Sequence, residues 1–263
     1  MKKIIACVLA LMILVFACSC NKEAPTETIL FEKYDAKVSA HRGVSGLEVE
    51  NTESAFILAG EHSYYGIETD VHKTIDGKFV ICHDDTVKRL SGQDIAVETS
   101  TLETLLNIPL YDKNTEILGE ERLTDLQSYI KICKRYDKQA ILELKSDFTQ
   151  EEIANIIAII VANDYLNRVT FISFDYDNLL YVRNILPTQS AQLLFSELSD
   201  ELADKLIRDK IDVAIHYKAL TKEALKKFHN AGLKVNCWTI DNKATAERLA
   251  KMGVDYITTN ILE

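Results

Sequence analysis

The stretch Ile67-Glu68-Thr69-Asp70-Val71 is one of eight short runs, rich in β-branched and other apolar residues, that recur along the chain. Segments with helical periodicity separate these runs; in residues 151–161, isoleucines recur at positions i, i+3, i+4 and i+7. Alternating strands and helices indicate a parallel sheet, and eight such units predict an α/β fold, the closed (β/α)8 TIM barrel. An open, doubly wound sheet is the alternative, but no glycine-rich phosphate loop follows the first run. The other seven runs are residues 38–40, 141–144, 169–173, 191–195, 213–216, 235–239 and 256–258.

Two features depart from a regular barrel. Residues 84–122 form a connection far longer than the usual loop of about two to six residues, so we expect a small insertion after the second barrel strand, over one mouth of the barrel. The chain stops at Glu263, directly after the eighth run, and the final helix is therefore expected to be missing or shortened. Residues 29–34 are expected either to cover the resulting gap or to plug the barrel floor.

Length and composition limit the classes of protein to which the chain can belong. Its 263 residues suit one barrel, and 47% hydrophobic with 27% charged residues excludes wholesale disorder. The formal net charge of −10 argues against general nucleic-acid binding, which needs a basic surface. If the protein binds phosphate, the positive charge must be local.

The first 20 residues have the pattern of an export signal. Lys2 and Lys3 precede an apolar run, residues 4–17, that is too short for a membrane-spanning helix of about 20 residues. Residues 15–20, Val-Phe-Ala-Cys-Ser-Cys, resemble a bacterial lipobox, which implies cleavage and lipidation at Cys18 or Cys20. The alternatives are a plain secretory signal and an uncleaved anchor. We therefore expect a lipid-anchored cell-envelope protein, on the periplasmic or outer-membrane face, with residues 21–36 as tether and N-terminal cover and residues 37–263 as the barrel.

Polar side chains follow the predicted strands at the end where a TIM barrel carries its active site. His41-Arg42-Gly43 comes directly after the first run, and His83 follows the apolar residues 79–82. Glu68 and Asp70 alternate along one strand, so both point to the same face, roughly 7 Å apart. His72 shares this face, but we expect it to point to solvent where the strand leaves the barrel rather than to be a fourth ligand. Glu143 and Lys145 end the third barrel strand with the same spacing. Later strands also end in polar or aromatic residues, namely Ser173, His216, Trp238 and Asn260.

These residue types favour metal-assisted cleavage of a phosphodiester. Three carboxylates on adjacent strands form an oxygen-rich site for Ca²⁺ or Mg²⁺, whereas the chain lacks the imidazole or thiolate motifs typical of zinc sites. Two histidines could divide the acid and base roles, and Arg42 and Lys145 could hold a phosphate. The alternative is structural, with Glu68 and Asp70, or Glu143, paired to those cations in ordinary ion pairs.

Several motifs in order and spacing resemble the glycerophosphodiester phosphodiesterase family. The resemblance begins at His41-Arg42-Gly43, continues with Glu50-Asn51-Thr52 and spans roughly residues 38–260. Two departures are Val49, where the family usually has proline, and Thr259-Asn260, where many members have aspartate and to which we assign no role. The remaining motifs are Gly66–Val71, Thr74 with Asp76-Gly77, Val80–Thr86, Glu143–Lys145, Ser173–Asp175, Val235–Thr239 and Gly253–Thr258.

The resemblance implies a barrel with an insertion after strand two and a role for each site residue. Glu68, Asp70 and Glu143 would hold the divalent cation, and His41 and His83 would form the acid–base pair, in an order left open. Arg42 would bind the phosphate, Lys145 would steady its negative charge, and Trp238 would line the glycerol side.

The implied activity is hydrolysis of a glycerophosphodiester to an alcohol and sn-glycerol 3-phosphate. In the mechanism proposed for the family, the substrate's own neighbouring hydroxyl attacks first and water then opens the cyclic phosphate. Two alternatives are a phospholipase C- or D-like enzyme for intact or lyso-phospholipid, and a non-catalytic lipoprotein that binds glycerophosphodiesters. The sequence leaves open the head-group alcohol, the choice between Ca²⁺ and Mg²⁺, and the oligomeric state.

Overall fold

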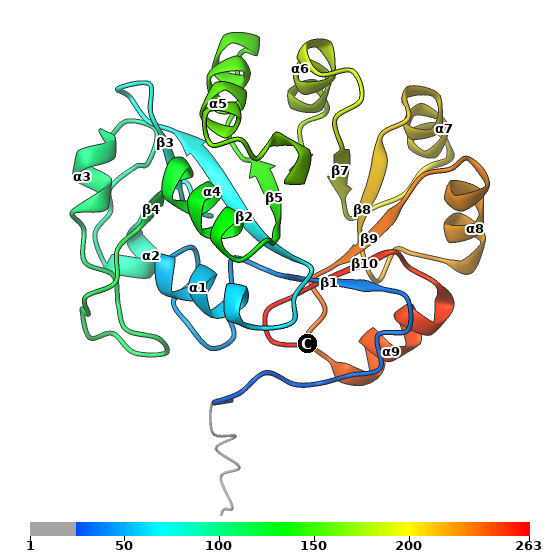
Figure 1. Cartoon of the computed structure of the whole chain (residues 1–263), viewed down its shortest axis with the longest axis horizontal. Coiled ribbons are helices and arrows are strands. Elements are labelled where there is room, and N and C mark those ends of the chain that lie inside the picture. Colours follow the sequence, from blue (N-terminus) through cyan, green and yellow to red (C-terminus); the bar gives the residue numbers. More distant parts are fainter. Residues whose placement is uncertain (1–24) are drawn as a thin grey trace, which may run out of the picture.

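Eight parallel strands close into a barrel in the computed structural model, which describes residues 25–263 (Figure 1). The barrel runs in the order β1, β2, β5, β6, β7, β8, β9, β10, and β1 closes it by pairing with both β2 and β10. Each of the eight predicted runs forms one of these strands, so the predicted (β/α)8 barrel is confirmed. The strands are β1 (Lys37–Ala40), β2 (Gly66–Lys73), β5 (Gln139–Leu144), β6 (Val169–Ser173), β7 (Ala191–Phe195), β8 (Asp212–His216), β9 (Val235–Trp238) and β10 (Tyr256–Thr259).

The pairing of β2 with β5 brings the predicted acidic residues together. In this parallel register Asp70 lies beside Glu143, and Glu68 is two residues earlier on the same face of β2. Both strands are buried almost throughout because helices cover their outer face and the barrel interior fills the inner one. The carboxylates are thus fixed by barrel strands.

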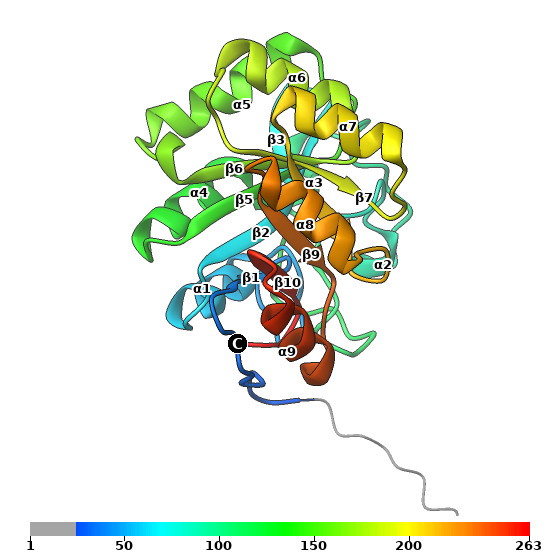
Figure 2. The same cartoon turned by 90° about the vertical axis from the view of Figure 1, so that its right-hand side faces the viewer.

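Helices surround the barrel (Figures 1 and 2). A capping box begins the helix near residue 151, with the Thr149 side chain accepting from the Glu152 amide and the Glu152 side chain accepting from the Thr149 amide. Thr221 likewise caps the helix that follows it. The outer helices are α1 (Glu53–Glu61), α4 (Leu126–Arg135), α5 (Gln150–Ala162), α6 (Tyr176–Ile185), α7 (Asp200–Asp209), α8 (Lys222–Asn230) and α9 (Lys243–Met252), with a short 3₁₀ turn, η1 (Leu166–Arg168), before β6.

The long connection after β2 forms the predicted insertion. Strand β3 (Phe79–Ile81) turns back antiparallel to β2, and the two-residue strand β4 (Thr124–Asp125) pairs with β3 outside the barrel. Between them lie α2 (Lys88–Ser91) and α3 (Leu102–Leu106). The insertion has its own small apolar core, which includes Val80, Cys82, Val87, Val97, Leu105 and Leu110.

The gap between α9 and α1 is covered by two extended segments, since no helix follows β10 in the described chain. Ile29 pairs with Leu262, and Phe31 packs into the barrel's apolar core, so residues 29–34 cover the gap, one of the two expected arrangements. Both views place the C-terminus beside the N-terminal segment (Figures 1 and 2). None of the helices within residues 25–263 is long and apolar enough to cross a membrane.

Candidate active site

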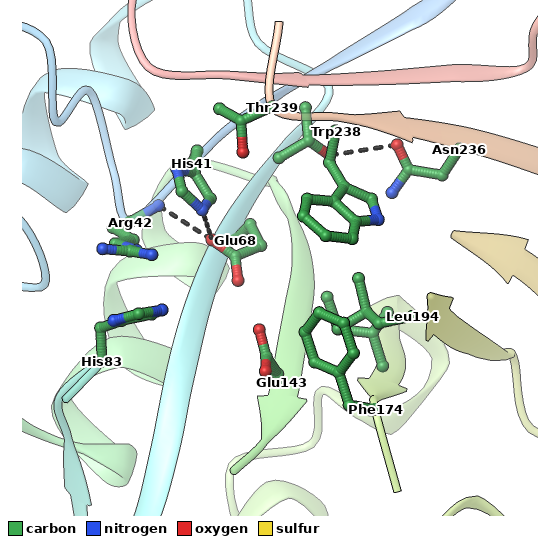
Figure 3. Close-up of a pocket in the computed structure, with 12 residues that line it drawn as sticks. His41, Arg42, Glu68, His83, Glu143, Phe174, Leu194, Asn236, Trp238 and Thr239 are labelled. Atoms are coloured by element: carbon green, nitrogen blue, oxygen red, sulfur yellow. Dashed lines mark hydrogen bonds and ion pairs between the residues drawn. The ribbon is translucent and has the colours of Figure 1, made fainter. Parts of the chain in front are cut away.

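A pocket of about 130 Å³ opens at the carboxyl ends of the barrel strands (Figure 3). One side of it is polar and carries the two histidines and two of the acidic residues, while the other side is apolar and aromatic. Asp70 and Lys145 lie directly against this lining, so the structure brings together all eight predicted site residues. The lining residues are His41, Arg42, Glu68, His83, Glu143, Ile172, Phe174, Leu194, Asn236, Trp238, Thr239 and Thr258.

The turn after β1 places His41 and Arg42 in the pocket. The His41 amide donates to the Thr259 carbonyl at 2.8 Å, which extends the β1–β10 pairing by one residue. Arg42 and Gly43 then adopt positive φ angles of 55° and 78°. A Cβ atom at Gly43 would lie 2.7 Å from the backbone of Ala55, so only glycine fits this turn against α1.

Glu68, Asp70 and Glu143 form a buried carboxylate cluster, with one oxygen of each residue within 4.8 Å of the others. Burial and the negative charges of Asp70 and Glu143 raise the pKa of Glu68 well above its usual range. Burial and the charge of Asp70 raise the pKa of Glu143 to about 7, although Lys145 acts in the opposite direction. Asp70 Oδ1 is buried and accepts no hydrogen bond from the described residues. The unbonded Asp70 oxygen and the mutual repulsion of the three carboxylates fit a hard divalent cation.

Two cations flank the cluster. Arg42 Nε lies 3.5 Å from Asp70 Oδ2, is buried and donates no hydrogen bond within residues 25–263. Lys145 Nζ lies 3.1 Å from Glu143 Oε1 and 3.9 Å from Asp70 Oδ1. The charges of Glu143 and Asp70 raise the pKa of Lys145 against the opposing effect of its burial. The site therefore has a free guanidinium donor and a fixed ammonium group to offer an anion.

A neutral amide fixes the orientation of His41. Asn260 Nδ2 donates to Asp241 Oδ2 at 2.6 Å, and because a carboxylate only accepts, Asn260 Oδ1 must face His41 Nδ1, 2.6 Å away. His41 Nδ1 therefore carries the proton, and the bare Nε2 points toward Glu68 Oε2 at 3.9 Å. Burial and the charge of Arg42 lower the pKa of His41 to about 4, so this ring is neutral near pH 7.

His83 has a charged partner instead. Its Nδ1 lies 2.7 Å from Asp84 Oδ1, and this carboxylate requires a proton on Nδ1. The same contact fixes the tautomer and the orientation of the His83 ring. Figure 3 shows the His83 ring reaching into the pocket from the insertion side, below Arg42.

The apolar side of the pocket is formed by Trp238, Phe174 and Leu194 (Figure 3). The rings of Trp238 and Phe174 meet edge to face with their centroids 5.5 Å apart, and His216 packs on Trp238 at 5.3 Å. Trp238 Nε1 donates to the Ala214 carbonyl at 2.9 Å, which fixes the indole. This side can take a carbon skeleton.

The structure adds residues that sequence reasoning missed. Asn51 donates to Asp70 Oδ2 at 2.9 Å, and Asn260, to which no role was assigned, holds His41. The only signal for Asn51 was its place in the Glu-Asn-Thr motif, and the only signal for Asn260 was its place at the end of the last barrel strand. One expectation was wrong: His72, predicted to point to solvent where β2 leaves the barrel, is 2% exposed, because the insertion covers this part of β2.

The comparisons with known proteins agree with this geometry. The model of the glycerophosphoryl diester phosphodiesterase family matches residues 41–263. A glycerophosphodiester phosphodiesterase of Caldanaerobacter subterraneus subsp. tengcongensis is 31% identical over 85% of this chain and 93% of its own length. The structure resembles an Oleispira antarctica phosphodiesterase in complex with the product sn-glycerol-3-phosphate (TM-score 0.78, 27% identity, 85% of this chain and 92% of that chain). It also resembles a glycerophosphodiester phosphodiesterase from Parabacteroides distasonis (TM-score 0.72, 28% identity, 87% and 94%).

The match covers most of the chain, and the pocket contains the family's histidine, arginine and carboxylate motifs at the mouth of one barrel. We conclude that the chain belongs to the glycerophosphodiester phosphodiesterase family.

Proposed function

We propose that this enzyme hydrolyses glycerophosphodiesters to an alcohol and sn-glycerol 3-phosphate. One observation carries the proposal: two histidines with different hydrogen-bond partners flank a carboxylate cluster in a single pocket, beside an arginine whose Nε donates no hydrogen bond within residues 25–263. The Oleispira antarctica structure, described as a complex with sn-glycerol-3-phosphate, supports this choice of product.

Glu68, Asp70 and Glu143 would hold a divalent cation, Ca²⁺ or Mg²⁺, because their oxygens converge and Asp70 Oδ1 accepts no hydrogen bond from residues 25–263. When bound, this cation supplies positive charge for the phosphate oxygens. Asn51 orients Asp70, since its side-chain amide donates to Asp70 Oδ2 and its carbonyl accepts from Thr69.

His41 acts as the general base. Its Nε2 lacks a proton, because Asn260 holds the proton on Nδ1, and burial keeps the ring neutral. Nε2 accepts the proton of the substrate's neighbouring hydroxyl, whose oxygen forms a bond to phosphorus and gives a cyclic phosphate.

His83 acts as the general acid. Asp84 accepts from Nδ1–H and orients the ring, and Nε2 delivers a proton to the alcohol oxygen as the bond between that oxygen and phosphorus breaks. In the second step the roles reverse: a water that attacks phosphorus gives its proton to His83, and His41 returns its proton to the ring oxygen that leaves. Both histidines thereby regain their starting states.

Arg42 and Lys145 hold the phosphate, and Trp238 lines the glycerol side. The buried Arg42 Nε is available to donate to a phosphate oxygen, whereas Lys145, paired with Glu143, supplies a point charge. The Trp238–Phe174 wall faces the carbon skeleton of the glycerol unit.

Phosphorus NMR of a panel of glycerophosphodiesters tests the activity. Residues 25–263 would be incubated with each compound after chelation and again with added Ca²⁺ or Mg²⁺, and we expect sn-glycerol 3-phosphate to appear only with metal. The same panel identifies the preferred head group and metal. Tight binding without turnover at saturating metal would refute hydrolysis and support a non-catalytic binding lipoprotein.

A second substrate class is favoured by one observation. Ile117 and Leu118, in the insertion, are 68% and 49% exposed, and an apolar segment in this region is what an intact or lyso-phospholipid would require. A side-by-side assay of a lysophospholipid and its deacylated diester decides between the two. Preference for the lysolipid, lost in Ile117→Ser, would favour a phospholipase C- or D-like enzyme.

We also propose that the protein is exported and anchored to the cell envelope, on the periplasmic or outer-membrane face, by a lipid on Cys18 or Cys20. The support is the lipobox-like sequence of residues 15–20, which lies outside the described residues. Labelling cells with a clickable fatty acid would test this: we expect label in the wild type and its loss in either Cys18→Ala or Cys20→Ala. Label retained in the double variant would refute lipidation there.

A further inference from the structure

One arginine of the insertion contacts the surroundings of both His83 and Arg42, yet the proposed mechanism gives it no part. Arg89 lies on α2, outside the barrel. All three nitrogens of its guanidinium are engaged, and all their partners are carboxylates. Lys88, the neighbour of Arg89 on α2, instead forms an exposed ion pair with Asp94.

The first arm of this arrangement leads to His83. Arg89 Nε donates to Asp84 Oδ2 at 2.7 Å, and the other oxygen of the same carboxylate, Oδ1, lies 2.7 Å from His83 Nδ1. Asp84 is thus held between the arginine and the histidine, and its plane sets the orientation of the His83 ring.

The second arm leads to Arg42. The two terminal nitrogens of Arg89 donate to the two oxygens of Glu50, each at 2.8 Å, which is a bidentate pair. Glu50 Oε1 also accepts from an Arg42 terminal nitrogen at 2.9 Å, while the Arg42 Nε faces Asp70 Oδ2 at 3.5 Å. Glu50 is only 15% exposed, so its charge depends on these two arginines.

The protonation states agree with this arrangement. Burial opposes the charged form of Glu50, but the hydrogen bonds and charges of Arg89 and Arg42 outweigh it and lower the pKa of Glu50 to about 2. The pKa of Asp84 is likewise lowered to about 2, because bonds from Arg89 and His83 outweigh its burial. Both carboxylates are therefore charged acceptors throughout the neutral range.

We infer that Arg89 is a positioning residue, which fixes His83 through Asp84 and fixes Arg42 through Glu50. The insertion thereby sets the distance between the proton donor, His83, and the phosphate ligand, Arg42. A lysine could not replace it, because one ammonium group cannot match the planar fork that reaches both carboxylates. The inference rests on the proposed function, since it concerns the same reaction.

The test separates the two arms with two substrates and one inhibitor. A glycerophosphodiester of an alkyl alcohol needs the proton from His83, whereas one of 4-nitrophenol has a leaving group that departs without it. The inhibition constant of sn-glycerol 3-phosphate reports phosphate binding by Arg42. The variants are Arg89→Met, Arg89→Lys, Asp84→Asn and Glu50→Gln, with Lys88→Met as the matched control on the same helix.

We expect kcat/KM for the alkyl substrate to fall about 10²-fold in Arg89→Met, with Arg89→Lys recovering little. Asp84→Asn should lose turnover of the alkyl substrate far more than of the aryl substrate, with product inhibition unchanged. Glu50→Gln should weaken product inhibition and slow both substrates equally. Arg89→Met should show both effects, and Lys88→Met neither.

Two results would overturn the inference while leaving the proposed function intact. The first is Arg89→Met behaving like Lys88→Met on both measures. The second is an equal loss of kcat/KM on both substrates in Arg89→Met, with unchanged product inhibition and a lowered melting temperature. A residue that only stabilises the fold would give that result. A wild type that hydrolyses neither substrate refutes the proposed function, and the inference with it.

Discussion

The two histidines of the pocket lie in different regions of the molecule, and their partners differ in charge. His41 belongs to the barrel: β1 and β10 carry it and its partner, and that partner is the neutral amide Asn260. His83 belongs to the insertion side, directly after β3, and its partner is the carboxylate Asp84. His41 is thus held by a neutral acceptor and His83 by a negatively charged one.

The proposed assignment of base and acid, which the motif alone left open, rests on this difference. Each ring holds a proton on Nδ1, so the two tautomers are alike and only the charge of the partner distinguishes them. A neutral ring can accept a proton, whereas a ring beside a carboxylate can supply one. In the proposed mechanism the barrel therefore provides the base and the insertion side provides the acid.

Removing each imidazole tests this assignment with the largest expected effect. We expect His41→Ala and His83→Ala each to lower kcat for an alkyl glycerophosphodiester by about 10³- to 10⁴-fold, the usual scale of general acid–base catalysis. With the 4-nitrophenyl ester, His83→Ala should regain most of its rate and His41→Ala should not.

Steady-state kinetics with both substrates measure this contrast, and circular dichroism confirms that each variant folds. Full activity in either variant would show that the residue has no catalytic role. Recovery of His41→Ala instead of His83→Ala would reverse the assignment of acid and base.

The second effect concerns the barrel side alone. Asn260→Ala removes the acceptor that holds the proton on His41 Nδ1, so the ring can rotate or adopt the other tautomer. We expect kcat to fall about 10²-fold, equally for alkyl and aryl substrates. Ser45→Ala is the matched control, because Ser45 Oγ donates to the same Asn260 oxygen without touching His41. Equal losses in both variants would contradict the tautomer argument.

The sequence predicted most of the fold and little of these partners, for a physical reason. Strand periodicity and the alternation of strands with helices depend on local residue order, and all eight barrel strands were found from it. Glu68 and Asp70 were found because alternation along a strand fixes their common face. Asn260 lies 219 positions from His41, and only closure of the barrel by β1–β10 pairing brings them together. Arg89 likewise depends on how the insertion folds back, which no local pattern indicates.

The carboxylate cluster lies between the two regions and gives a smaller, pH-dependent effect on stability. The folded-state pKa of Glu143, about 7, exceeds its ordinary value of 4.5. Between these two pH values the folded protein keeps a proton that the unfolded chain has lost. Without metal, this residue therefore lowers the free energy of unfolding as pH rises from about 4.5 to 7, and the loss persists above pH 7.

At pH 8, after treatment with a chelator, we expect the free energy of unfolding of Glu143→Gln to exceed that of wild type by on the order of 2 kcal/mol. This figure already allows for the loss of the ion pair with Lys145. The advantage should disappear near pH 5, where wild-type Glu143 is protonated in the fold. Denaturant unfolding at both pH values measures it. A difference that does not change with pH would contradict the raised pKa, and added Ca²⁺ or Mg²⁺ should stabilise wild type more at pH 8 than at pH 5.

The smallest expected effect lies on the apolar side of the pocket, away from both histidines. Trp238→Leu removes the edge-to-face contact with Phe174 and the Nε1 bond to the Ala214 carbonyl but no proton-transfer group. An aromatic contact contributes about 1 kcal/mol, so we expect KM to rise about five-fold with kcat within two-fold of wild type. Because neither proton transfer involves the indole, alkyl and aryl substrates should be affected equally. A loss confined to kcat for the alkyl substrate would instead mean that Trp238 acts on the orientation of His83. The claim that the apolar side of the pocket takes no part in proton transfer would then be wrong.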